Sequence, residues 1–175
     1  MRKNNNTGRM TVVLPHGALF RKGAEGKIRK ELLEQDLLEA VVGLGSNVFY
    51  GSPLAACIMV FKRKKEDDKK NKMLFIDASD QIRVGRAQNI LEHKHVQKIL
   101  QWYSNYKDVE GYVKVATIED LEENEFNLNI PLYVEKTIEN NLPTVEEAMT
   151  DLTRVWQDSL EAEERFKSIL LRFVG

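Results

Sequence analysis

The stretch that decides the fold is residues 11–61, TVVLPHGALFRKGAEGKIRKELLEQDLLEAVVGLGSNVFYGSPLAACIMVF. Short apolar runs bounded by turn-forming residues indicate strands at Thr11–Leu14, Ala40–Leu44 and Ala55–Phe61. Pro15 ends the first, because proline cannot donate to a strand ladder. Gly45–Pro53 joins the other two without a helix, and a link this short cannot make a parallel crossover. The sequence therefore predicts an α/β fold in which these two strands are antiparallel.

A charged helix is predicted between the first two strands, at residues 24–35. Ile28 and Leu32 share one face of this helix, and Leu33 widens it. We expect this face to be buried. The charged residues should then cover the exposed side: Glu25, Lys27, Arg29, Lys30, Glu31 and Glu34.

The loop Asn47–Gly51 carries two aromatic residues, Phe49 and Tyr50, out of the predicted sheet. Aromatic side chains beside a sheet edge can hold a flat, unstacked base. The alternative is that both rings simply close the end of the strand pair. The residues of the loop alone do not separate these two interpretations.

The composition is that of an ordinary globular protein and narrows the possible functions. The 175 residues have 42% apolar side chains, 30% charged side chains and a net charge of −1, so no global basic field indicates nucleic-acid binding. Cys57 is the single cysteine and lies in an apolar run, which predicts a buried side chain and a reducing, cytoplasmic compartment. We expect no membrane association, because no apolar run approaches the ~20 residues of a membrane helix.

The remaining elements follow from shorter patterns. The charge run Lys62–Lys72 could contact DNA phosphates, but its three acidic residues favour a solvated turn. Thr117 is a candidate N-cap, with Asp120 three residues on. We expect an extended segment at Leu128–Pro131, because a residue before proline avoids the helical region. Further predicted elements are strands at Met73–Ile76 and Val113–Ala116 and a helix at His93–Tyr106.

The last segment has the strongest helix signals in the chain. Thr144 and Glu147 form a capping box at its start. Four heptads of apolar residues follow, giving ~45 Å of helix at ~1.5 Å per residue. This stripe could dock on a partner or fold back on the chain's own domain. The docking candidates are Leu152, Val155, Trp156, Phe166, Ile169 and Phe173.

Several of these segments together resemble the modification (M) subunit of type I restriction–modification systems, an adenine-specific DNA methyltransferase. The matching segments are VVLPHGALFR, GAEGKIRKELLEQDLLEAVVGL, NVFYG, CIMVFKRKK, LFIDAS and NLNIP, spread over residues 12–134. The resemblance implies the C-terminal part of a Rossmann-like methyltransferase sheet with an antiparallel closing hairpin, followed by a mostly helical C-terminal region. Residues 11–134 would belong to the catalytic domain, 1–10 to a disordered lead and 143–174 to a subunit-docking helix.

The resemblance also predicts which strands of the family sheet these residues form and which functional motifs they lack. Strands at 11–14, 40–44 and 55–61 match the fifth, sixth and seventh strands of the family sheet. The sequence contains neither the glycine-rich loop that holds S-adenosylmethionine nor an Asn-Pro-Pro-Phe type motif. We therefore expect no cofactor and no catalytic residue here, and a fragment that is inactive alone although its parent is an enzyme.

The site residues implied by the family lie in two loops. Phe49 matches the aromatic that stacks on the flipped adenine, with Tyr50 beside it. Pro15, His16, Gly17 and Asn47 match the loops near the target pocket, with His16 expected to be structural. His93 and His95 are too few for a metal site, so we expect none.

The implied partners are the DNA-specificity subunit, which would take the C-terminal helix into a bundle, and the restriction subunit. DNA would be bound only within that complex. The alternative is a non-catalytic module that binds a partner subunit or itself. The strand Thr11–Leu14 would leave one edge unpaired, which predicts a homodimer or an edge covered by the chain's own termini.

Overall fold

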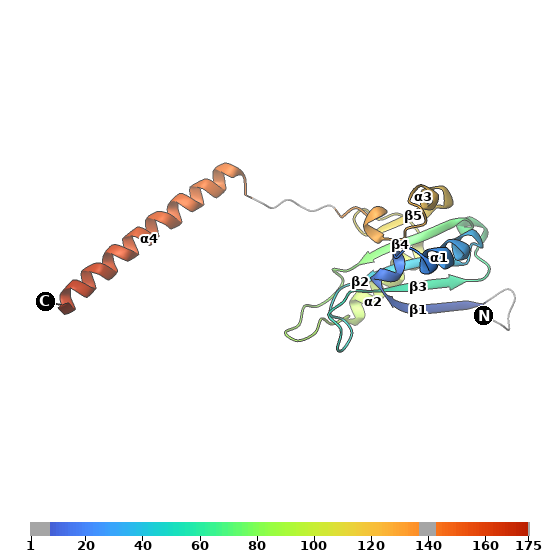
Figure 1. The fold of residues 1–175 in the computed structure, drawn as a ribbon, viewed down its shortest axis with the longest axis horizontal. Helices are drawn as coiled ribbons and strands as arrows, with labels where there is room; N and C mark the ends of the chain where they lie inside the picture. The colour runs from blue at the N-terminus through green and yellow to red at the C-terminus, as the bar shows by residue number, and fades with distance from the viewer. Residues whose placement is uncertain (1–7, 137–142, 175) are drawn as a thin grey trace. The chain divides into compact units, whose positions relative to one another are not determined.

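The computed structural model describes residues 8–136 and 143–174, which fall into two compact units divided after Thr137. The first unit is built on one five-stranded sheet in the order β1-β3-β2-β4-β5 (Figure 1). Its strands are β1 (Arg9–Pro15), β2 (Leu38–Leu44), β3 (Ala56–Lys62), β4 (Lys72–Ala78) and β5 (Val113–Thr117). The second unit contains helix α4 (Val145–Val174).

Strand directions confirm the predicted antiparallel pair and show its place in the sheet. β3 lies between β1 and β2 and is antiparallel to both. β4 is parallel to β2, and β5 is antiparallel to β4. β1, β2 and β4 therefore run in the same direction, and their carboxyl ends meet at one end of the sheet. Within the described residues β1 pairs only with β3, so its outer edge is unpaired.

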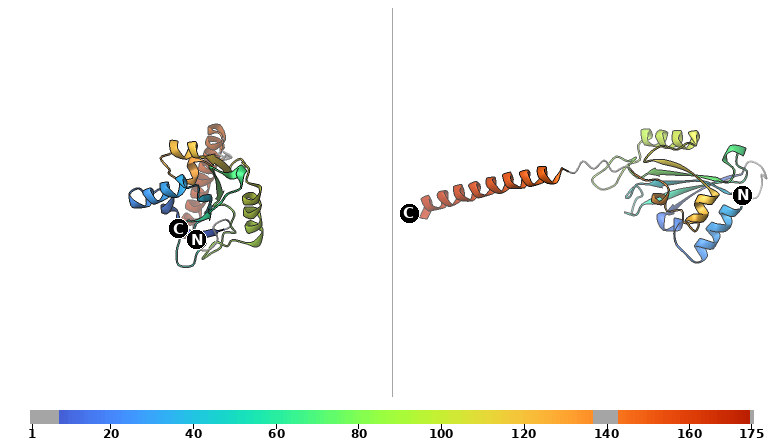
Figure 2. Two further views of the ribbon diagram at one scale, coloured as in Figure 1. Left: turned by 90° about the vertical axis from the view of Figure 1, so that its right-hand side faces the viewer. Right: turned by 90° about the horizontal axis from the view of Figure 1, so that it is seen from above.

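Helices cover both faces of this sheet (Figure 2). On one face lie α1 (Ala24–Glu34), α3 (Ile118–Glu123) and the short 3-10 helices η1 (His16–Leu19) and η3 (Ile130–Leu132). Their core includes Leu19, Leu33 and Phe75. The other face is covered by α2 (His93–Asn105), whose Trp102 packs on Leu74 and Ile76. A further 3-10 helix, η2 (Asp67–Lys69), lies in the turn between β3 and β4.

The expected buried face of α1 is wrong at two positions. Ile28 is exposed and Arg29 is buried. The guanidinium of Arg29 donates hydrogen bonds to the carbonyls of Phe126 at 2.9 Å and Ala18 at 3.0 Å. These bonds satisfy the buried cation, although burial still lowers its pKa. Arg29 thereby holds the segment after β1 against the rest of the core.

The turn between β3 and β4 is also less solvated than its sequence predicts. Lys62 and Lys65 are buried, because each reaches an acidic residue outside the turn. Lys65 pairs with Asp36. Lys62 pairs at 3.3 Å with Glu39, which is only 1% exposed and occupies a β-bulge in β2. Such a bulge redirects one side chain to the other face of the sheet.

Other local expectations are met with small shifts. β1 begins at Arg9, two residues before the expected start. Thr117 and Asp120 form a capping box at the start of α3, and Cys57 is fully buried. The extended segment predicted at residues 128–131 is wrong beyond Asn129, because η3 begins at Ile130. A proline in the first turn of a 3-10 helix needs no backbone donor, so Pro131 fits there.

Candidate nucleic-acid interface

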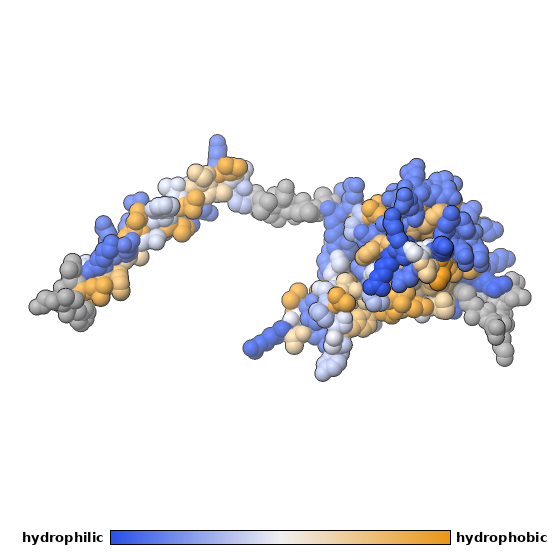
Figure 3. Space-filling model, in the orientation of Figure 1, coloured by the Kyte–Doolittle hydropathy of each residue, from blue (hydrophilic) through white to orange (hydrophobic). Residues whose placement is uncertain are grey.

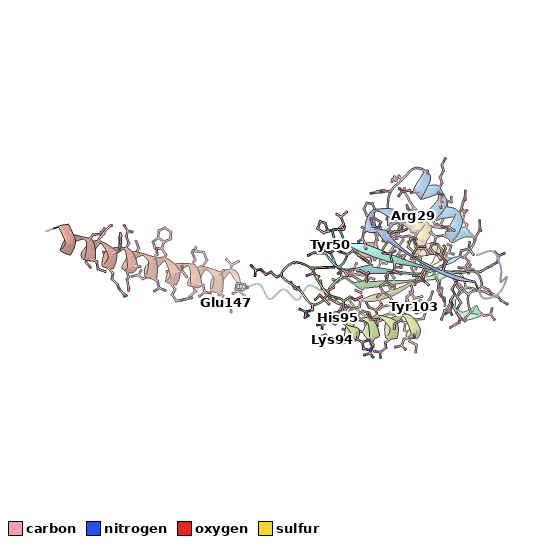
Figure 4. The ribbon with its side chains drawn as sticks, turned by 90° about the horizontal axis from the view of Figure 1, so that it is seen from below. Arg29, Tyr50, Lys94, His95, Tyr103 and Glu147 are labelled. Carbon is pink, nitrogen blue, oxygen red and sulfur yellow. The ribbon has the colours of Figure 1, made fainter. Side chains whose placement is uncertain are left out.

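The candidate site lies where the carboxyl ends of β1, β2 and β4 meet. Ligands of open α/β sheets bind outside this end of the strands. Three segments project from it: the η1 turn, residues 45–55, which we call the aromatic loop, and residues 79–92, which we call the arginine loop. Figure 4 shows Tyr50 at this end of the sheet, with Arg29 and Tyr103 lying away from it on opposite faces.

The aromatic loop is a tight turn that sends its two rings to different places. Asn47 has a left-handed backbone with φ 54°, and its N–H donates to the carbonyl of Pro53 at 3.2 Å. Tyr50 at the tip is 97% exposed, whereas Phe49 is 40% exposed. Phe49 forms one wall of a cavity of about 180 Å³ that also includes Pro15 and Leu54. The cavity lies between this loop and the end of β1.

The arginine loop supports the aromatic loop through four hydrogen bonds. Asn47 Nδ2 donates to the carbonyl of Ala87 at 3.1 Å, and the N–H of Asn89 donates to the carbonyl of Asn47 at 2.9 Å. The side-chain amides of Gln88 and Asn89 donate to the carbonyls of Val48 and Ser46 at 2.6 and 2.9 Å. The sequence interpretation placed Asn47 in the site but gave the arginine loop no role. Its two adjacent side-chain amides were the signal that could have indicated it.

The segment after β1 places His16 beside the core rather than in the cavity. His16 begins η1, and its ring lies 3.6 Å from the point where a Cβ on Gly43 would stand. Its Nε2 atom is buried and has no hydrogen-bond partner within the described residues. Gly17 follows in η1, close to the Arg21 side chain. Pro15, His16 and Gly17 are therefore neighbours of the candidate site, with Pro15 alone lining the cavity.

The two apolar cavities beside β1 do not fit S-adenosylmethionine. Holding this cofactor in such folds takes a glycine-rich turn from a strand into a helix N-terminus. The cavity near Phe49 is lined by apolar residues and Ser52, with no carboxylate for a ribose. A second, apolar groove of about 350 Å³ lies between α1 and strands β1 and β3, and its only carboxylate, Glu25, pairs with Arg21. No step of a reaction is assigned to this cofactor in these residues.

The described residues offer neither a three-residue metal site nor a membrane-spanning helix. Within residues 8–136 and 143–174, no group of three His, Cys, Asp or Glu side chains could hold a metal ion. His95 instead accepts a hydrogen bond from the N–H of Glu92 at 3.1 Å, as part of the capping box of α2. No helix in the same residues is long and apolar enough to cross a membrane.

The second unit presents the predicted apolar stripe on α4. Its capping box is present, with Glu147 accepting from the N–H of Thr144 at 2.8 Å. Apolar side chains gather along the helix (Figure 3), and Trp156 is 65% exposed. The side chain of Phe173 lies outside the described residues. The other predicted docking residues are all exposed: Leu152, Val155, Phe166 and Ile169.

The strand order and directions agree with the antiparallel closing pair that the resemblance implies for a DNA methyltransferase region. The profile of the N-6 DNA Methylase family matches residues 1–141. The chain therefore belongs to this family.

Its relatives are subunits of restriction systems. The type I restriction enzyme MjaVII methylase subunit of Methanocaldococcus jannaschii is 35% identical over 167 residues, covering 94% of this chain and 28% of the relative. A crystal structure of the type I restriction-modification methyltransferase subunit from Streptococcus thermophilus is 40% identical, with a TM-score of 0.70, over 74% of this chain and 27% of that one. The chain thus spans less than a third of these relatives.

One solved structure resembles nearly the whole chain. It comes from work on complex assembly and conformational transition of a type I restriction-modification system, and it covers 96% of this chain and 37% of its own. The sequence identity is 19% and the TM-score is 0.58, so this likeness supports the fold alone.

Proposed function

We propose that these residues form the target-base side and the docking helix of an adenine-specific DNA methyltransferase subunit of a type I restriction–modification system. In this proposal, the S-adenosylmethionine site and the amine-binding motif lie in other residues of the complete enzyme. Residues 1–175 alone would therefore not methylate DNA. The complete enzyme would act in the cytoplasm.

The position of Phe49 carries this proposal. Its ring forms a wall of the cavity at the carboxyl ends of the strands, on a loop that is fixed by hydrogen bonds. A base that has left the duplex needs an aromatic face in a fixed position to stack on. Such stacking is worth ~1–3 kcal/mol per base. Tyr50 lies beyond the cavity and would contact the DNA around the extruded base.

The exposed stripe of α4 supports a partner role for the second unit. Trp156 and its apolar neighbours would pack against helices of the DNA-specificity subunit, burying side chains that are exposed here. The restriction subunit would join through the same complex. The same stripe, with the free edge of β1, favours the second candidate, a non-catalytic module that binds a partner subunit or itself.

Methyl transfer from labelled S-adenosylmethionine to DNA tests the proposal in the complete enzyme. Phe49→Ala is expected to lower kcat/KM by about 5- to 150-fold, which corresponds to the loss of one stacked base. Leu100→Ala removes an exposed apolar side chain from α2 and is the matched control. Unchanged methylation by Phe49→Ala would overturn the assigned role. Partner binding without any methyl transfer by the wild-type complex would support the second candidate.

Calorimetry with residues 1–175 alone tests the proposed location of the cofactor site. We expect no binding of S-adenosylmethionine. A dissociation constant tighter than ~100 μM, which represents about 5.5 kcal/mol, would contradict the proposal.

A further inference from the structure

The arginine loop has a fixed conformation up to its tip. Its ends are joined by backbone hydrogen bonds between Arg83 and Ile90, at 2.8 and 2.9 Å. A side chain on Gly85 would meet the carbonyl of Gln88 at 2.1 Å, so the turn requires glycine at this position. With the four bonds to the aromatic loop, these contacts make the two loops one structural unit.

The tip of this unit has the chemistry of a DNA contact. Val84 is 79% exposed, and Arg86 is exposed without a hydrogen-bond or ion-pair partner in the part of the chain that the structure describes. Arg83 is already paired with Glu92 at 2.6 Å. No acidic residue occurs between Asp80 and Glu92, and residues 45–55 carry no charge at all. The charge of Arg86 is therefore not offset locally.

We propose that the tip of the arginine loop, through Arg86 and Val84, binds the DNA backbone beside the extruded base. Arg86 would neutralise a phosphate, and Val84 would pack against the adjoining sugar. This inference rests on the proposed function and extends it to a loop that the sequence interpretation did not use. Because phosphate contacts fix position without reading sequence, the loop would hold the duplex in place for any target sequence.

The expected occupant of the loop tip is DNA rather than protein, because the guanidinium of Arg86 has no ion-pair partner within the described residues. An unpaired guanidinium on a loop that is hydrogen-bonded to the aromatic loop matches the pattern by which proteins hold nucleic-acid backbones beside unstacked bases. The rest of the molecule offers a contrast at the opposite end of the sheet. There, Lys62, Lys65 and Lys70 line a larger hollow and are each paired with an acidic residue, while Arg9 and Lys64 line it without an ion pair among the described residues. Those cations lie at the end of the sheet away from Phe49 and the aromatic loop, so we assign them no contact beside the extruded base.

The test is DNA binding by the complete methyltransferase as a function of salt, with Arg86→Ala and Val84→Ser. Arg86→Ala is expected to weaken binding roughly tenfold for target and non-target duplexes alike, and to reduce the slope of log K against log salt by about 1. Val84→Ser should weaken binding without changing the slope. The thermal midpoint should stay unchanged in both variants, because neither side chain is packed in the core.

Arg63→Ala is the matched control, since Arg63 is an exposed arginine at the opposite end of the sheet. It should leave binding and slope unchanged. The inference would be overturned if Arg86→Ala bound DNA as tightly as the wild type, or if Arg63→Ala lost as much DNA affinity as Arg86→Ala. Neither result would contradict the proposed role in methyl transfer. An effect of Arg86→Ala on subunit assembly alone would assign the tip to a protein partner instead. A wild-type enzyme that never methylates DNA would instead refute the proposed function, and the inference with it.

Discussion

The phenol of Tyr103 on α2 donates a 2.6 Å hydrogen bond to the buried carboxylate of Glu39 on β2. Lys62 holds the other carboxylate oxygen, and the Tyr106 hydroxyl reaches the backbone carbonyl of Glu39 at 3.4 Å. This network joins α2, the bulge in β2 and the end of β3. Burial and the neighbouring carboxylate raise the pKa of Tyr103, so its hydroxyl remains a donor at all ordinary pH values.

Tyr103→Phe should lower the free energy of unfolding by about 1–3 kcal/mol, because it leaves a buried carboxylate short of one donor. Glu39→Gln should cost about 2–3 kcal/mol, since Lys62 keeps Glu66 as a partner. Tyr112→Phe is the control: its ring stacks on Trp102, and its hydroxyl has no hydrogen-bond partner within the described residues. Urea denaturation measures all three, and equal losses for Tyr103→Phe and Tyr112→Phe would contradict the network.

Weakening the hydrogen bonds between the arginine loop and the aromatic loop should slow DNA methylation without lowering the stability of the fold. Asn89→Ala removes the side-chain hydrogen bond to the carbonyl of Ser46 in the aromatic loop, together with the bond that Asn89 Oδ1 accepts from the N–H of Gly85. We expect a several-fold loss of kcat/KM for methylation, because Phe49 is no longer held in place, and a thermal midpoint close to that of the wild type. Asn105→Ala, at the exposed C-terminal end of α2, should change neither quantity.

The thiol of Cys57 should be unreactive in the folded protein. Burial raises its pKa from 9.0 to about 11, so folding favours the protonated form. Since the unfolded thiol ionises first, stability should fall as pH rises from about 9 to about 11, and be unaffected by this group below that range. Reaction with a disulfide reagent should be slow in buffer and fast in guanidinium. Rapid labelling of the folded protein would contradict the burial.

The stripe on α4 should control binding to the specificity subunit. Trp156→Ala is expected to weaken the complex by about 2 kcal/mol or more, as expected for a central aromatic anchor. Gln157→Ala changes the next residue, which lies with Thr153 and Arg154 on the polar side of the helix, and should be neutral. Calorimetry with the purified subunit measures both. Equal losses of binding for Trp156→Ala and Gln157→Ala would show that the apolar stripe does not form the interface with the specificity subunit.

The free edge of β1 should make isolated residues 1–175 self-associate. Val13 is exposed on this strand, and an unpaired edge with apolar side chains is a template for another strand. Val13→Lys should therefore shift the molar mass from light scattering toward the monomer, because a charged residue on an edge strand opposes pairing. Leu100→Lys on α2 is the control. A monomeric wild type in which the Thr11–Leu14 edge is also open to solvent would refute this expectation.

The sequence predicts the strands better than the buried polar residues. Apolar runs such as residues 40–44 and 73–76 locate the sheet, and the short link after Leu44 fixes the direction of β3 relative to β2. Arg29 and Lys62 are expected in water from the sequence, and Glu39 has no predicted role, because a charge on a helix or strand gives no local sign of its distant partner. Among their partners, Phe126 lies 97 residues from Arg29, and Glu39 lies 23 residues from Lys62. Burial of this kind is a property of the assembled fold.

The sequence predicted the aromatic loop of the candidate site but not the arginine loop, because the latter depends on partners that are distant in the sequence. Asn47, Phe49 and Tyr50 are noticeable in the sequence because two aromatics follow a turn-forming residue. The arginine loop offers only its two adjacent side-chain amides as a signal, because its role depends on hydrogen bonds to residues about forty positions earlier. The placement of Phe49 against the cavity and of Tyr50 outside it likewise comes from the fold and not from their adjacency.

The open side of β1 has a consequence for how such an enzyme can be encoded. A strand already held in register by β3 dictates the alignment of any polypeptide added along it. A gene divided just before this strand could therefore yield two products that rejoin by backbone pairing, with no covalent connection between them.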